Sequence, residues 1–201
     1  MARQYRMRKR AEVQEQTREK IIRATMKLHD EQGIIATTFA DIAARAGVGQ
    51  ATVHRHFPTP AALVQTCGMH VWQELQPPQP GDGAALFAGE ETQAGRLWRL
   101  VTAIDAFYRR GAHRFAIAYR ERAAMPEIDG FLKAVEGGVE ALVREALLPL
   151  DVQEEAARAA VALTRFCVWN ELAATGLERE RMLDLQYRLL ETAIAGPSAS
   201  T

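Results

Sequence analysis

The stretch that most constrains the fold of this 201-residue chain is Thr37–Phe57, TTFADIAARAGVGQATVHRHF. Thr38 is a residue type that caps helix N-termini, and Asp41 follows it at the spacing of a capping-box acid. Gly47 can adopt the left-handed conformation that ends a helix. We therefore predict two short helices joined by a tight turn, the second of them over residues 50–57.

Apolar residues surround this turn at helical spacing. Ile42, Val48 and Val53 are placed to face inward, and Ala43 is small enough to let two helices approach closely. This is the helix-turn-helix pattern, which lays its second helix in the major groove of DNA. The window taken alone also fits an ordinary corner between two helices.

The composition favours an all-α protein. The chain is 48% hydrophobic, is rich in Ala, Leu, Arg and Glu, and contains no alternating strand pattern. No apolar stretch approaches the roughly 18 residues of a membrane-spanning helix, so we expect no membrane partner and a cytoplasmic location. Two cysteines, Cys67 and Cys167, do not make a disulfide framework, and a redox role for either is left open.

The formal net charge of zero conceals an asymmetry along the chain. Residues 1–60 carry 11 Lys and Arg against 6 Asp and Glu, whereas the remaining 141 residues carry 14 against 19. A basic end joined to an acidic body suits a protein that contacts a polyanion at one end. We interpret residues 1–11 as a flexible basic arm that lies on phosphates or in the minor groove, or else as a tail without a role.

A longer segment carries a family resemblance. An amphipathic helix over 12–33 precedes GIIATTFADIAARAGVGQATVHRHFPTPAAL, and this order resembles the DNA-binding domain of the TetR family of bacterial transcriptional repressors over about residues 12–75. The positions at the family's spacing are Gly33, Thr37, Thr38, Ile42, Ala43, Ala46, Gly47, Val48, Thr52, Phe57, Ala62 and Leu63.

The resemblance implies an all-α protein of about nine to ten helices, with an N-terminal three-helix helix-turn-helix domain and a C-terminal helical domain for ligand binding and dimerisation. The expected parts are a basic arm at 1–11, the helix-turn-helix domain at 12–58, a connecting helix at 60–75, a hinge loop at 76–83, the ligand-binding and dimerisation domain at 84–195, and a tail at 196–201.

The resemblance also implies DNA contacts. Gln50 and Arg55 are candidates for base edges, because Gln can pair with adenine and Arg with guanine. Thr38, at a helix N-terminus, is a candidate for a phosphate. The full expected set is Thr38, Arg45, Gln50, Ala51, Thr52, His54, Arg55 and His56, with Arg8 and Arg10 from the arm.

Some residues depart from the family pattern. His54 and His56 stand where the family usually has Tyr, and Thr59-Pro60 replaces a Ser-Lys pair whose Lys grips phosphate. A protonated imidazole can also donate to phosphate, so we expect mildly pH-dependent binding. The two histidines are two residues apart, so on a helix they diverge, and we predict no metal site.

Beyond residue 84 we predict helices from the breaks at Gly111, Pro126, Pro149 and Gly176. The expected helices are 84–90, 93–110, 113–124, 127–148, 152–175 and 178–195. Small residues in 152–175 and bulky ones in 178–195 predict a homodimer held by a four-helix bundle, the alternative being an intramolecular hairpin.

Aromatic residues gather in residues 93–125 and 164–170, where they fill a helical core or line an apolar pocket for a small-molecule effector. The candidate pocket residues are Trp98, Phe107, His113, Phe115, Tyr119, Arg120, Phe166, Trp169 and Asn170.

The leading hypothesis is therefore a sequence-specific DNA-binding regulator, a dimeric repressor released from its operator by a small molecule. Loss of the phosphate-gripping Lys keeps open an interaction protein of the same fold that no longer binds DNA. A small helical enzyme is the weakest alternative, because the best acid–base group is Glu121 and Glu127 near His113. We expect no cofactor.

Overall fold

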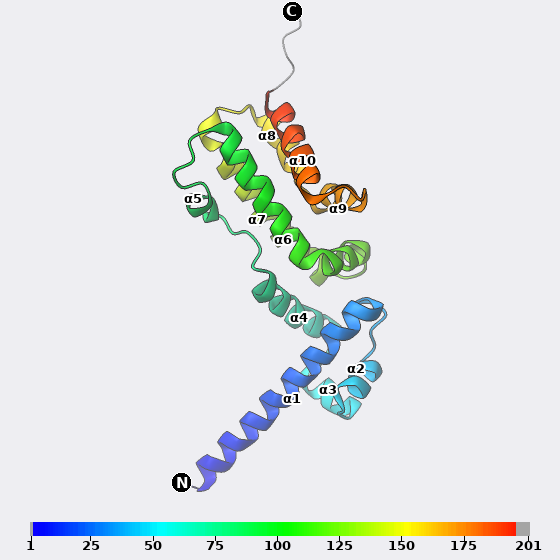
Figure 1. The fold of residues 1–201 in the computed structure, drawn as a ribbon. Coiled ribbons are helices and arrows are strands. Elements are labelled where there is room, and N and C mark those ends of the chain that lie inside the picture. Colours follow the sequence, from blue (N-terminus) through cyan, green and yellow to red (C-terminus); the bar gives the residue numbers. More distant parts are fainter. Residues whose placement is uncertain (1, 196–201) are drawn as a thin grey trace, which may run out of the picture. The chain divides into compact units, whose positions relative to one another are not determined.

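The computed structural model describes residues 2–195, with side chains from Gln4 onward, so the expected tail at 196–201 lies outside the described residues. Residues 2–195 form helices and no strand, which confirms the all-α prediction (Figure 1). The helices are α1 (Ala2–Gln32), α2 (Phe39–Ala46), α3 (Gln50–His56), α4 (Pro60–Leu75), α5 (Asp82–Leu86), α6 (Gln93–Glu121), η1 (Arg122–Ala124), α7 (Pro126–Leu147), η2 (Leu148–Leu150), α8 (Glu154–Leu163), α9 (Phe166–Ala174) and α10 (Arg179–Ala195).

The chain divides into two compact units. The N-terminal unit contains Met1–Glu74 and Ala116–Phe131, and the C-terminal unit contains Leu75–Phe115 and Leu132–Thr201. The expected ligand-binding domain at 84–195 is thus interrupted, because the end of α6, η1 and the start of α7 pack with the N-terminal residues. Along residues 2–195, each helix is too short or too polar to cross a lipid bilayer.

The core of the N-terminal unit joins α1 to the three helices that follow. Burying these apolar side chains contributes most of the energy that holds the short helices α2 and α3 in place. The buried set is Ile21, Ile22, Leu28, Ile42, Ala43, Val53, Phe57, Leu63 and Cys67. Burial also raises the pKa of the Cys67 thiol to about 12, so this cysteine is an inert core residue at neutral pH.

The prediction of a flexible arm at 1–11 is wrong for residues 2–11, which are the first turns of α1. Residues 2–16 contain no Gly or Pro and consist largely of Ala, Arg, Gln, Met, Lys and Glu, which are good helix formers. They also extend a helix that packing has already nucleated, and each added residue then gains a hydrogen bond without a new nucleation cost.

The predicted break at Gly111 is also wrong, because α6 runs through it without interruption. A Cβ at Gly111 would lie 2.6 Å from Leu75 Cδ1 and 2.8 Å from Phe115 Cε2. Glycine therefore allows a close approach here, and a single glycine inside a long helix costs only about 1 kcal/mol relative to alanine.

The expected single helix at 152–175 is instead two helices, α8 and α9, separated at Thr164 and Arg165. The Thr164 hydroxyl donates to the carbonyls of Ala160 (3.1 Å) and Val161 (2.9 Å), and such bonds compete with the helical ladder. The Tyr108 hydroxyl donates to the Thr164 carbonyl (3.1 Å), so the break does not leave this buried carbonyl without a hydrogen bond.

The expected hinge loop at 76–83 is anchored to α7. The Glu145 carboxylate accepts hydrogen bonds from the backbone N–H groups of Gly81 (2.6 Å) and Gly83 (2.7 Å). About two turns earlier in α7, Gly138 lies against the backbone of Pro78. A Cβ at Gly138 would overlap the carbonyl oxygen of Pro78. These contacts fix the segment within the C-terminal unit.

Candidate nucleic-acid interface

The helix-turn-helix begins with the predicted cap. The Asp41 N–H donates to Thr38 Oγ1 (3.2 Å), and Asp41 Oδ2 in turn accepts from the Thr38 N–H (3.1 Å) and hydroxyl (2.6 Å). This is a complete capping box at the start of α2, and it lowers the pKa of Asp41. The Thr38 hydroxyl proton is therefore already engaged, and a phosphate would have to compete with Asp41 for it.

The turn between α2 and α3 has the predicted left-handed residue. Gly47 has φ 65° and ψ 38°, and its N–H bonds back to the last turn of α2. The Val48 N–H then donates to the Ala43 carbonyl at 3.0 Å. A residue with a Cβ would be strained at this φ, so the glycine sets the angle at which α3 leaves the turn.

One side of α3 is fixed in the core and the other is exposed. Val53 is fully buried and Phe57 is 2% exposed, and the Arg18 guanidinium lies 5.4 Å from the centre of the Phe57 ring. The opposite surface presents two base-reading candidates, Gln50 and Arg55, to solvent. Within the predicted set, Gln50, Ala51, His54 and Arg55 are exposed, whereas Thr52 and His56 are half-buried.

The two histidines have different surroundings. The imidazole of His54 packs edge-on against Phe39, with ring centroids 4.7 Å apart. The pKa of His56 is lowered, first by partial burial and then by Arg55 and Arg18, so this ring is neutral near pH 7. Pairing with phosphate through a protonated His56 would have to overcome this shift.

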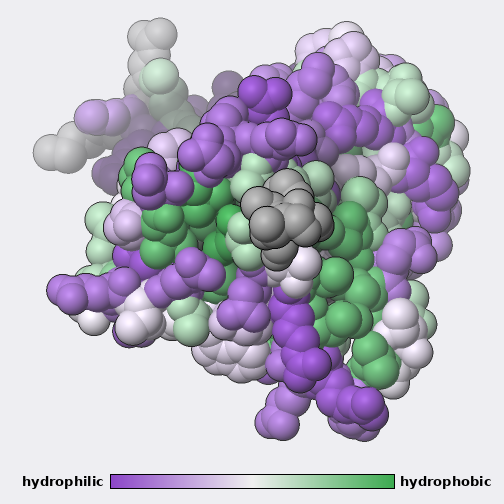
Figure 2. Space-filling model, turned by 90° about the horizontal axis from the view of Figure 1, so that it is seen from above, coloured by the Kyte–Doolittle hydropathy of each residue, from purple (hydrophilic) through white to green (hydrophobic). Residues whose placement is uncertain are grey.

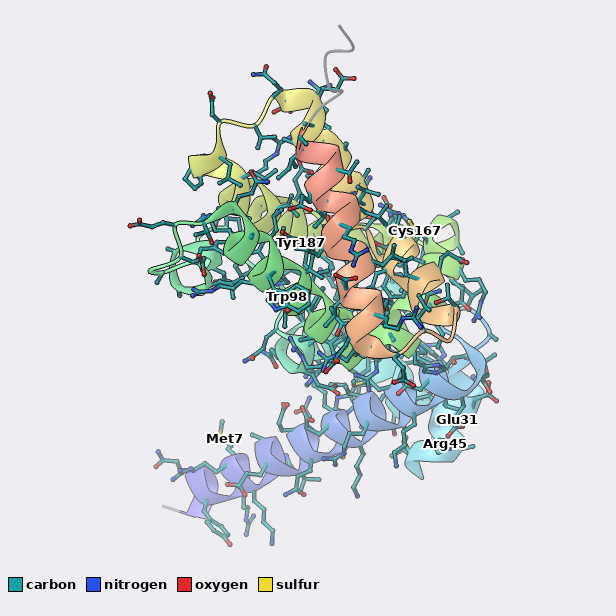
Figure 3. All side chains as sticks on the ribbon, turned by 45° about the horizontal axis from the view of Figure 1, so that its top comes forward. Met7, Glu31, Arg45, Trp98, Cys167 and Tyr187 are labelled. Carbon is teal, nitrogen blue, oxygen red and sulfur yellow. The ribbon has the colours of Figure 1, made fainter. Side chains whose placement is uncertain are left out.

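Arg45 does not extend freely toward solvent. Its guanidinium forms a bidentate pair with Glu31 at the end of α1, with Nη1–Oε1 at 2.9 Å and Nη2–Oε2 at 2.6 Å (Figure 3). The pair lowers the pKa of Glu31 and raises that of Arg45. It ties α1 to the last turn of α2, a role that sequence reasoning missed because 14 residues separate the partners.

A carboxylate that sequence reasoning did not assign to this unit supports the same region. Glu121 Oε2, at the end of α6, accepts hydrogen bonds from the backbone N–H groups of Ile34 (2.8 Å) and Ile35 (3.1 Å). Gly33 has φ 96°, and this turn presents both N–H groups to one carboxylate. Because Glu121 is engaged in this way, it is not a free acid–base group. Nothing in the local sequence marks a pair 87 residues apart.

Four of the candidate effector residues come together in the C-terminal unit. Phe107, Phe115, Phe166 and Trp169 are buried, and neighbouring rings in this set lie 5.3–5.8 Å apart between centroids. Tyr108 lies at the centre of the cluster and contacts all four rings. Sequence reasoning noted its aromatic neighbourhood but did not choose Tyr108 as a pocket residue.

The other effector candidates are half-buried or exposed. Trp98 is 44% exposed and contacts Tyr187 of α10, with ring centroids 6.0 Å apart (Figure 3). His113 is exposed and Asn170 is half-buried. Tyr119 and Arg120 belong to the N-terminal unit, where they line an open surface groove of about 530 Å³ together with Arg122, Ala123, Met125, Pro126 and Asp129.

Residues 21–67, from the buried part of α1 to α4, match the family model of bacterial regulatory proteins of the tetR family. This segment is a TetR-family DNA-binding domain. The chain is accordingly a DNA-binding transcriptional regulator, as its sequence predicted. The match contains the capping box, the Gly47 turn and the whole of α3.

Solved structures of other proteins resemble nine-tenths or more of the chain. The regulator LfrR from Mycobacterium smegmatis, solved with proflavine, is 25% identical, with a TM-score of 0.51 over 90% of this chain and 98% of LfrR. The hemolysin II regulator HlyIIR is 16% identical, with a TM-score of 0.63 over 90% and 98% of the two chains. The multidrug binding protein EbrR, solved with imidazole, is 17% identical, with a TM-score of 0.61 over 92% of each chain. No curated protein matches the chain.

Two departures from the TetR-family pattern have clear structural consequences here. The Thr59 hydroxyl accepts a hydrogen bond from the Ala62 N–H (3.1 Å), so it caps α4, and Pro60 occupies the first helical position. The start of α4 thus offers backbone groups and no lysine. Arg8 and Arg10 are exposed on α1.

Proposed function

We propose that this regulator is a repressor that binds its operator as a homodimer and leaves it when a small molecule binds the C-terminal unit. It would act on chromosomal DNA in the cytoplasm. The observation that carries the proposal is the surface of α3, where Gln50, His54 and Arg55 are exposed while Val53 anchors the helix from behind. A helix presented in this way fits the major groove.

Within the major groove, Gln50 and Arg55 read base edges, because their side chains can form bidentate pairs with adenine and guanine. Ala51 and the methyl group of Thr52 offer apolar contact for a thymine methyl group. Thr38, His54 and His56 contact phosphates in this proposal, and such contacts position the protein without reading sequence. Arg45 contributes to the positioning of α2 through its pair with Glu31.

Dimerisation uses α8 and α10. These helices pack against each other, and α10 leaves Leu185 and Leu189 more than a third exposed at a spacing of one helical turn. Hydrophobic residues also reach the surface in the view of Figure 2, between hydrophilic ones. Two copies are needed because a two-fold site presents its half-sites about 34 Å apart, one helical turn of DNA.

The effector is a flat aromatic molecule. LfrR, which was solved with proflavine, supports this, as does the aromatic cluster around Tyr108 in the present chain. Linkage then requires that the effector bind more tightly to a conformation whose two α3 helices no longer fit adjacent major grooves.

The test of DNA reading is selection of an operator from a random duplex library, followed by binding measurements on the selected site. Gln50→Ala and Arg55→Ala should each weaken binding to that site by about 1–3 kcal/mol and relax the preference at one base pair. Gln73→Ala, a change at an exposed glutamine on α4, should leave the preference intact. Failure to enrich any sequence would overturn the proposal and favour an interaction protein.

Two further measurements test the dimer and the effector. Light scattering should give the mass of two chains for the wild type and of one chain for Leu185→Glu/Leu189→Glu. Proflavine fluorescence should respond to the protein alone, without DNA, and the response should be lost in Tyr108→Ala. A monomeric wild type would refute the dimer, and a response that persists in the variant would refute the aromatic site.

A further inference from the structure

The first four turns of α1 form a helix without a partner. Every side chain from Gln4 to Gln16 is exposed, including those of Tyr5 (67%) and Met7 (65%). Isolated helices of this length are marginal in water, and this one continues directly from the packed part of α1. It therefore extends beyond the packed part of α1 (Figure 1), and its lysine and arginine side chains make it basic.

Helical register places two of the arginines on a defined face. Arg6 and Arg10 precede Ala24 and Leu28 by 18 residues each, which is five complete turns. Ala24 and Leu28 are both buried, and Leu28 belongs to the core cluster that α1 shares with the helix-turn-helix. Arg6 and Arg10 thus lie along the side of α1 on which α2 and α3 are packed.

The acidic side chains of this segment lie elsewhere around the helix. At 100° per residue, Glu12 and Glu15 are rotated by about 140–160° from the midpoint between Arg6 and Arg10. Lys9 lies between the two faces, whereas Arg8 lies on the acidic side, about 180° from the midpoint between Arg6 and Arg10. The side of the extension that faces the same way as the helix-turn-helix is therefore cationic and free of acids.

We propose that residues 4–16 dock as a helix on the sugar–phosphate backbone that flanks the major groove read by α3, through Arg6 and Arg10. This inference rests on the proposed function. The helix contacts the backbone and not the minor groove, because an α-helix about 10–12 Å wide does not fit a minor groove about 6 Å wide. Residues 2–16 span about 22 Å, the rise of about six base pairs.

The docked helix adds affinity and salt dependence without adding sequence preference. Each phosphate neutralised by a lysine or arginine contributes about 0.9 to the slope of log K against log salt concentration. Contact through two arginines should therefore account for about 1.8 of the slope. The start of α4 has no lysine to contact phosphate, and the two arginines of the docked helix offset the affinity that this lysine would contribute.

The experiment compares two double variants that remove the same charge. Arg6→Gln/Arg10→Gln should lower the slope by about 1.8 and shorten the protected operator segment on its flank, with unchanged base preference. The matched control, Arg8→Gln/Lys9→Gln, should change the slope by less than half as much. Equal effects of the two variants would indicate a general charge effect and would overturn the docked face.

A third variant tests whether the helix itself is needed. Ala11→Pro keeps every charge but removes a backbone donor and disrupts the helix between the arginines and the packed part of α1. It should reproduce the loss of slope seen for Arg6→Gln/Arg10→Gln, with a matching decrease in helical circular dichroism. An unchanged slope would show that the segment acts as a flexible chain.

These outcomes separate the two proposals. If the wild-type protein binds no operator, the proposed function and the docked helix both fail. If the wild type binds its operator and Arg6→Gln/Arg10→Gln retains the full slope, only the docked helix fails. In that case, capture of an acidic protein by the wild type and not by the variant would assign the basic face to a protein partner.

Discussion

The Glu121 carboxylate holds the backbone N–H of Ile34, with Oε2 and the nitrogen 2.8 Å apart. The same oxygen accepts from the Ile35 N–H at 3.1 Å, so one side chain fixes the segment between α1 and α2. Glu121 is the last residue of α6, whose earlier turns carry Phe107 and Tyr108. The helix that contributes to the aromatic cluster thus also ends on the segment that leads into the helix-turn-helix.

Glu121→Ala should destabilise the protein and weaken operator binding. Hydrogen bonds to a charged group contribute about 1.5–3 kcal/mol, and the variant leaves two backbone donors without this acceptor. We expect a loss of about that size in the free energy of unfolding, measured by urea denaturation, together with weaker binding in a gel-shift assay. Glu91→Ala, a change at an exposed glutamate in a loop, should alter neither. Normal operator affinity in Glu121→Ala would show that this contact does not position α2.

Two adjacent glycines of α7 should respond in opposite ways to alanine. At Gly138 a Cβ would overlap the Pro78 carbonyl, whereas at Gly137 it would meet nothing within 4 Å. Gly137→Ala should therefore raise the free energy of unfolding by about 0.5–1 kcal/mol through helix propensity. Gly138→Ala should lower the melting temperature by several degrees. Equal melting temperatures for the two variants would mean that the 76–83 loop does not lie on this face of α7.

His29 should make the N-terminal unit sensitive to acid. Burial lowers the pKa of its imidazole from 6.5 to about 4, against the opposing charges of Asp30 and Glu121. Between these two pH values the unfolded chain binds a proton that the folded protein does not, so stability is full above pH 6.5 and falls toward pH 4. The loss amounts to about 3 kcal/mol at 1.36 kcal/mol per pKa unit.

Urea denaturation of the wild type and of His29→Gln at several pH values between 7 and 4 measures this contribution. The wild type should lose about 3 kcal/mol more than the variant over this range. Parallel pH dependence of the two proteins would mean that His29 titrates normally.

Gln186 is a source of instability within the C-terminal unit. Its side chain is fully buried in α10, and neither its oxygen nor its nitrogen has a hydrogen-bond partner among the described residues. A buried polar group without a partner costs about 1–3 kcal/mol, so Gln186→Leu should raise the free energy of unfolding by about that amount. Gln153→Leu, at an exposed position, should have little effect. A less stable Gln186→Leu variant would indicate that the amide binds water or another polar group in solution.

Local rules were sufficient where the interacting residues are neighbours in the sequence. The capping box of Thr38 and Asp41 and the left-handed turn at Gly47 follow from side-chain chemistry and backbone freedom within a few residues. The burial of Val53 and Phe57 follows from helical spacing. Residues 2–11 are helical although their high charge favours a flexible arm, because the residues are good helix formers that extend a packed helix.

Distant contacts decided the features that these rules missed. Position 111 in the unbroken helix α6 is a glycine because Leu75 packs closely there, and the chain breaks at Thr164, whose carbonyl accepts a hydrogen bond from Tyr108. The partners in both cases lie more than 30 residues away, so no local pattern could reveal them.

The sequence by itself determined the helix-turn-helix and the outward face of α3, because capping, turn chemistry and hydrophobic period act over a few residues. The tertiary structure alone decided that Arg45 is paired with Glu31, that Glu121 holds Ile34, and which aromatic rings meet around Tyr108. Such pairings depend on how whole helices pack. The packing energy that selects them is a sum over the core, so no single position in the sequence reveals it.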